Sequence, residues 1–132
     1  MKIFISLIAL FLFGLFLSAC GKKEEQKPCY NMEIISGNNQ VGTAWQELPE
    51  PLKVRVSHPN GGASVANVEV WWLVIGGGGK ANPEVSKTDA NGIATTEWNL
   101  GMGDIQNLNA IVNNIFSCSN SQDIVYFRAT SK

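Results

Sequence analysis

The sequence predicts an all-β domain that follows a short N-terminal targeting segment. After residue 29, apolar and polar residues alternate with the period of two that is typical of half-buried strands. Clusters of Gly, Asn, Asp and Pro separate these runs and supply the backbone conformations that turns need. No apolar pattern recurs at helical spacing in this part of the chain. The length of 132 residues fits one domain.

The N-terminal segment predicts export. An apolar run extends from Ile3 to Leu17, and as a helix it would rise about 22 Å, short of the ~30 Å hydrocarbon core of a membrane. It is therefore typical of a signal peptide and not of a permanent span. The run ends in Leu17, Ser18, Ala19 and Cys20, which resembles the bacterial lipobox and implies cleavage after residue 19 and lipidation of Cys20. An ordinary signal peptide followed by an unrelated cysteine is the alternative.

A lipid at Cys20 would anchor the mature chain, because two or three acyl chains hold a protein in a membrane stably whereas one does not. We expect a lipoprotein signal peptide over residues 1–19, a polar tether over 20–29 and a folded domain over 30–132. In Gram-negative lipoproteins, Asp directly after the lipidated Cys retains the protein in the inner membrane. Gly21 stands there in this chain, so the resemblance implies the outer membrane. Orientation towards the cell surface or the periplasm is left open.

The other cysteines predict a disulfide bond. With Cys20 assigned to the lipid, Cys29 and Cys118 remain, and an exported chain enters an oxidising compartment. The bond would close a loop of about 90 residues, for which the chain-entropy model gives roughly 4 to 5 kcal/mol before strain is subtracted. Metal binding by the two cysteines is the alternative, although no CxxC pair or nearby His supports it.

Seven strands are expected after the tether. Four have apolar residues at alternate positions: Leu52, Val54 and Val56; Val68, Val70, Trp72 and Val74; Leu108, Ala110 and Val112; and Val125, Phe127 and Ala129. The other three are expected at residues 30–36, 84–88 and 93–99, and turn clusters fall at 59–62, 76–79 and 89–92. Short strands with regular turns predict a Greek-key β-sandwich of the immunoglobulin (Ig) type. Trp72 and Trp98 then belong to its core.

An ordered set of motifs also resembles a known family. They are Ser36 to Gln40, Leu48 to Val56, Val65 to Val70, the glycines at 76–79, Thr88 to Ala94 and Trp98 to Gly101. Together they resemble the group 1 bacterial Ig-like domain, the repeated module of invasin- and intimin-type adhesins, over roughly residues 33–130. The resemblance implies recognition or adhesion, although many such domains act as spacers. Those adhesins usually carry tandem domains on a β-barrel anchor, whereas we expect one domain and a lipid here, and the Asn-rich stretch 113–121 also departs from the family.

The predicted topology gives independent support to the disulfide. Because chain direction alternates in the sandwich, the start of the first strand and the loop between the last two strands lie at the same end. Cys29 precedes the first strand and Cys118 lies in that loop. The bond would fix the end of the domain that is nearest to the lipid, and it differs from the core disulfide of antibody domains.

Catalytic and ligand-binding signals are weak. A formal charge of −1 and a pI near 5.8 argue against nucleic-acid binding. The single His58 lies at a strand end, and the glycines 76–79 with Lys80 lack the remaining residues of a phosphate-binding loop. Asp89 and Asn91 form half of a calcium loop and are interpreted as a turn, with calcium at a domain end as the alternative. We expect no enzyme activity, cofactor, metal, nucleic acid or small-molecule substrate.

One predicted sheet face is unexpectedly apolar. Side chains directed away from the core on three adjacent strands are Trp71, Leu73, Ile75, Ile111, Ile124 and Tyr126. So many on one face exceed the scattered exposure of a monomer and indicate a partner-binding surface. The alternatives are that the long segment with Trp45 and Leu48 covers them, or that the strand register is shifted.

The sequence therefore predicts a membrane-anchored, non-enzymatic envelope lipoprotein that displays an Ig-like domain for protein recognition or adhesion. A structural subunit or spacer of a periplasmic or envelope complex is the alternative. The protein partner is not identified by the sequence.

Overall fold

The computed structural model describes residues 29–59, 62–112 and 122–132. The segment predicted as a signal peptide, Cys20, most of the predicted tether and Cys118 lie outside the described residues. The described residues form nine strands: β1 (Asn31–Ser36), β2 (Gln40–Gly42), β3 (Leu52–Ser57), β4 (Glu69–Gly76), β5 (Gly79–Asn82), β6 (Val85–Lys87), β7 (Ile93–Leu100), β8 (Ile105–Val112) and β9 (Ile124–Ser131).

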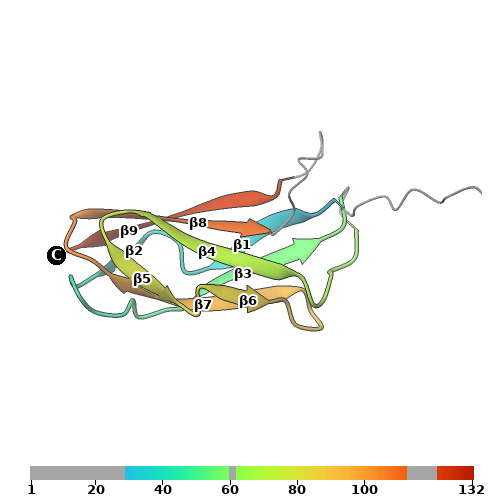
Figure 1. Cartoon of the computed structure of the whole chain (residues 1–132), viewed down its shortest axis with the longest axis horizontal. Helices are drawn as coiled ribbons and strands as arrows, with labels where there is room; N and C mark the ends of the chain where they lie inside the picture. The colour runs from blue at the N-terminus through green and yellow to red at the C-terminus, as the bar shows by residue number, and fades with distance from the viewer. Residues whose placement is uncertain (1–28, 60–61, 113–121) are drawn as a thin grey trace, which may run out of the picture.

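The strands form two layers that run along the long axis of the molecule (Figure 1). A four-stranded sheet has the order β1-β3-β7-β5, and a five-stranded sheet has the order β2-β9-β8-β4-β6. Neighbouring strands are antiparallel except β2 and β9, which are parallel. The prediction of an all-β, Ig-like sandwich is confirmed, and so is the predicted adjacency of β4, β8 and β9.

The core lies between the two sheets and takes alternate residues from each strand. The predicted inward residues of β3, β8 and β9 are all buried. Trp98 is fully buried, and the ring of Trp72 lies 5.9 Å from that of Phe127 at a tilt of 53°. The Trp72 indole N–H donates to the Ser86 hydroxyl at 2.8 Å. Both tryptophans therefore belong to the core, as predicted, and Trp72 also satisfies its polar atom.

Two strands were not predicted. β2 and β5 are short, and β5 carries one buried apolar side chain, Ala81. Backbone pairing with a neighbouring strand defines them, so no alternating pattern marks them in the sequence. The turn before β5 leads from one sheet to the other, with positive φ at Gly77, Gly78 and Gly79. A Cβ at Gly79 would collide with the Asn99 carbonyl, so glycine is required at this crossing.

The long segment between β2 and β3 packs against the four-stranded sheet. The Leu48 N–H donates to the Trp98 carbonyl at 2.9 Å, and the Leu100 N–H donates to the Gln46 carbonyl at 3.0 Å. Leu48 is buried in the core, whereas Trp45 is 69% exposed. Because this segment runs beside β7, it does not cover the outer surface of the five-stranded sheet.

Candidate protein-interaction face

The outer surface of the five-stranded sheet carries a continuous apolar row. The strand register places Val85 of β6 beside Trp71 of β4, Trp71 beside Ile111 of β8, and Ile111 beside Ile124 of β9. Successive residues of a strand point to opposite sides of the sheet, and the side chains on either side of Trp71 in β4 are buried. The row therefore lies on the side away from the core, across four strands.

A second row lies next to it along the strands. Leu73 is in register with Asn109, and Asn109 with Tyr126. Leu73 is 53% exposed and Tyr126 is 66% exposed. Asn109 is the polar member between them, and its side-chain oxygen is buried without a hydrogen-bond partner in the described part of the chain.

The six residues predicted for this surface lie on it, and we call them the apolar face: Trp71, Leu73, Ile75, Ile111, Ile124 and Tyr126. Ile111 and Ile124 are half-buried and the other four are exposed. Ile75 lies apart from the two rows, at a β-bulge near Asn107. Val85 and Asn109 also lie on this surface and were not among the residues predicted for it. The alternation in residues 84–88 carried a signal for Val85, but its place beside Trp71 depends on the pairing of β6 with β4.

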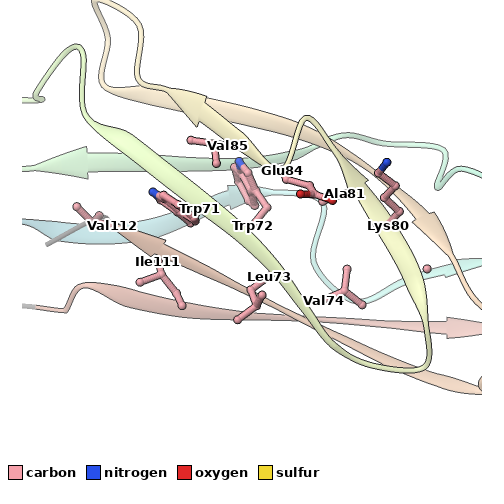
Figure 2. Close-up of a pocket in the computed structure, with 11 residues that line it drawn as sticks. Trp71, Trp72, Leu73, Val74, Lys80, Ala81, Glu84, Val85, Ile111 and Val112 are labelled. Carbon is pink, nitrogen blue, oxygen red and sulfur yellow. The ribbon is translucent and has the colours of Figure 1, made fainter. Parts of the chain in front are cut away.

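A hollow of about 620 Å³ borders the apolar face (Figure 2). It lies where the sheets separate, because β6 pairs with β4 only as far as Trp71, while β5 pairs with β7 in the other sheet. Figure 2 shows Leu73 and Ile111 on one side of the β4 ribbon and Lys80, Ala81 and Glu84 on the other. The lining is mainly apolar, so the hollow extends the apolar surface around the edge of β4.

Two solved structures of bacterial adhesins resemble this chain in fold. The Yersinia pseudotuberculosis adhesin InvE matches with a TM-score of 0.60 and 15% identity, over 80% of this chain and 32% of that chain. The D00–D0 domain structure of intimin matches with a TM-score of 0.50 and 18% identity, over 82% of this chain and 50% of that chain. The fold is that of a bacterial Ig-like domain of the invasin and intimin type.

No protein-family model and no curated protein sequence matches this chain. This Ig-like domain corresponds to half or less of each adhesin chain, so the likeness concerns the fold of one part of those proteins.

Asp89, Asn91 and His58, the polar residues considered in the sequence, lie in turns or at strand ends of the Ig-like domain. The Asp89 carboxylate accepts hydrogen bonds from the Asn91 N–H at 2.8 Å and the Ile93 N–H at 3.0 Å, which confirms the turn. His58 is exposed directly after β3, and its backbone N–H donates to the Ala63 carbonyl. Over the described ranges, no group of three or more His, Cys, Asp or Glu residues is placed to hold a metal ion. The same residues include no helix long and apolar enough to cross a membrane.

One carboxyl pair lies on the opposite side of the Ig-like domain. A side-chain hydrogen bond with Glu97 raises the pKa of Glu47 above its ordinary value, and repulsion from the Glu97 charge acts in the same direction. The pair joins the segment before β3 to β7, next to the bridge between Glu47 and Asn99. The pair lies on an exposed surface and forms part of no catalytic arrangement that we identify.

Proposed function

We propose that the protein is a lipid-anchored, non-enzymatic component of the bacterial envelope whose Ig-like domain recognises another protein through the apolar face. The observation that carries the proposal is that Trp71, Leu73 and Tyr126 remain about half exposed or more in the folded domain. The segment with Trp45 and Leu48, which was the alternative cover, lies on the other sheet.

The chemistry of the apolar face favours a protein partner. Burial of apolar surface contributes roughly 25 cal/mol per Å², and Trp and Tyr are frequent energetic anchors of protein interfaces. The two rows contain no charged side chain, so a partner that covers them leaves no buried, unpaired charge. A small polar substrate would need several convergent polar groups, whereas the two rows offer the Asn109 carboxamide, the Tyr126 hydroxyl and the Trp71 indole N–H on three different strands.

The anchor belongs to the proposal through Cys20, which would hold the domain at the membrane, with Gly21 favouring the outer membrane. A Cys29–Cys118 disulfide would fasten the adjacent end of the sandwich. In support, the Met32 N–H donates to the Gln122 carbonyl at 2.8 Å, and the Gln122 N–H donates to the Asn31 side chain at 3.0 Å. The chain on the C-terminal side of Cys118 thus returns next to the chain that follows Cys29.

The proposal is tested by photo-crosslinking in living cells. A photoreactive amino acid replaces Trp71 in one strain and Trp45, an exposed tryptophan outside the apolar face, in a control strain. We expect a protein adduct from position 71 and none from position 45. A folded Trp71→Lys variant that still forms every adduct and complex of the wild type would contradict the proposal.

A structural subunit or spacer of an envelope complex is the second candidate. It is supported by the two adhesin structures, in which the matched part is one portion of a longer chain. Protease treatment of intact cells, with Cys20→Ala as the unanchored control, separates the candidates. Cleavage on intact cells favours recognition at the surface, whereas cleavage that requires an opened envelope favours a periplasmic complex.

A further inference from the structure

We propose that the protein bound by the apolar face is a second copy of this chain, and that two Ig-like domains pack face to face about a two-fold axis parallel to β8. The inference rests on the proposed function, because it names the partner for the same surface.

The first argument is the symmetry of the two rows. On either side of β8, the first row has Trp71 and Ile124, and the second has Leu73 and Tyr126. A two-fold axis parallel to β8 therefore places Trp71 against the partner's Ile124 and Leu73 against the partner's Tyr126. These four side chains each meet an apolar side chain of the partner, as a self-complementary interface requires.

Asn109, the polar residue between Leu73 and Tyr126, is also compatible with this two-fold axis. Asn109 lies on β8 itself, between Leu73 and Tyr126, so the axis brings it towards the partner's Asn109. A carboxamide carries no net charge, so its approach to its own copy involves no charge repulsion. Identical charged surfaces repel each other, but neither row contains a charge. The charged residues on the same side of the sheet lie beyond the ends of the rows: Glu69 and Lys87 next to the first row, and Arg128 next to the second.

The second argument is area. The exposed parts of the apolar face and Val85 amount to roughly 500 Å² of apolar surface, since a large aromatic side chain has about 150–250 Å² to bury. A stable interface buries about 800 Å² per partner, of which about 55–65% is apolar. Complete burial of this surface would therefore supply about the non-polar area that one side of a stable dimer needs.

The third argument is the placement of the chain ends. Asn31 and Gln122 meet at one end of the sandwich. At the opposite end, near the C label of Figure 1, the Lys132 backbone N–H donates a hydrogen bond to the Gly42 carbonyl. An axis parallel to β8 keeps the N-terminal ends of both copies together, so two lipids at Cys20 would reach the same membrane. Confinement to one membrane also raises the effective concentration of each copy for the other. Two twisted sheets whose strands run in nearly the same direction also pack well face to face.

The experiment uses the full chain in its own cells, in two copies with different epitope tags. A photoreactive amino acid replaces Leu73, and the control strain carries it at position 45. We expect an adduct that contains both tags from position 73, with the crosslink mapped by mass spectrometry to the partner's β9 near Tyr126. The control position should give no such adduct.

The possible results separate the inference from the proposed function. An adduct with a different protein alone overturns the dimer but supports recognition by the apolar face. No adduct from position 73 or position 71 overturns both. A two-tag adduct that maps away from the partner's β9 overturns the two-fold arrangement.

A set of variants gives a second measurement. Trp71→Lys should lower the yield of the two-tag adduct at least tenfold, because it places like charges within an apolar interface. Trp45→Lys, with the same change at a tryptophan outside the apolar face, should leave the yield unchanged. If Trp71→Lys fails to accumulate as a folded protein, Tyr126→Lys takes its place, since Tyr126 is 66% exposed. Unchanged yield in a folded variant would overturn the inference.

Discussion

The outer surfaces of the two sheets differ sharply in composition. On the four-stranded sheet, β3 presents Lys53 and Arg55, and β7 presents Thr95 and Glu97. Arg55 also forms an ion pair with Glu33 of β1 at 3.4 Å. The corresponding surface of the five-stranded sheet presents the apolar face at its centre, with Glu69, Lys87 and Arg128 at its borders. Both sheets supply the same kind of inward side chains to one core, so the fold does not require this difference, and the proposed contact with a partner would account for it.

The largest expected difference is in stability, between substitutions of the two adjacent tryptophans that lie on opposite sides of β4. Trp72→Ala should lower the free energy of unfolding by about 3–5 kcal/mol, because it leaves a cavity beside Phe127. Trp71→Ala should lower it by about 1 kcal/mol or less in the monomer, since its side chain is half exposed. Chemical denaturation at a concentration where the protein is monomeric measures both. Equal losses would show that Trp71 is part of the fold and not of a binding surface.

The second effect compares exposed apolar residues on the two sheets. Leu73→Lys should reduce crosslinking from position 71 at least tenfold, because binding of the partner would desolvate the charged Lys side chain. Ile35→Lys changes a residue of β1 that is exposed to a similar extent, 47% against 53%, and should have no effect. In-cell crosslinking yield is the measurement. A comparable loss from Ile35→Lys would place the binding surface on both sheets.

A smaller effect is expected at the polar centre of the apolar face. Asn109→Leu removes a shielded oxygen that has no partner in the described residues and should raise the free energy of unfolding of the monomer by about 1 kcal/mol. Asn107→Leu, on the same side of β8, provides the matched control and should change stability less. Thermal unfolding of the purified variants measures the difference. A destabilised Asn109→Leu variant would mean that the carboxamide is already satisfied.

The smallest effect belongs to the polar sheet. Because the pKa of Glu47 is raised in the folded protein, the folded state holds the proton more tightly than the unfolded chain. This contribution to stability is present below the unfolded pKa and is lost as the pH rises through the folded pKa. Glu47→Gln should reduce the dependence of the unfolding midpoint on pH in this range, whereas Glu84→Gln should leave it unchanged. The unfolding midpoint measured against pH tests the expectation, and a wild-type midpoint that rises across the same range would contradict it.

The fold was predictable where side chains alternate strictly. Residues such as Val54 in β3 and Ala110 in β8 lie inward as predicted, because burial on one side of a strand imposes the period of two. β2 and β5 escaped prediction because backbone pairing holds them, and each is short and contains a single apolar residue other than glycine, Val41 or Ala81, which cannot form an alternating pattern.

The residues of the apolar face could be predicted from the sequence, but their exposure to solvent could not. Parity along β4 and the expected neighbours of β8 identified its six residues. Whether water reaches them depended on the path of the segment with Trp45 and Leu48, which forms backbone hydrogen bonds with β7. The position of Val85 beside Trp71 likewise depended on the short pairing of β6 with β4.

By itself, the amino-acid sequence determined the all-β class and the inward and outward sides of the main strands. These follow from local patterns, since the direction of a side chain in a strand depends only on its place in the alternation. The tertiary structure decided which surfaces are covered and which side chains form rows across strands. Those properties depend on contacts between residues far apart in the chain, such as Leu48 with Trp98 and Trp71 with Ile111, which no local pattern specifies.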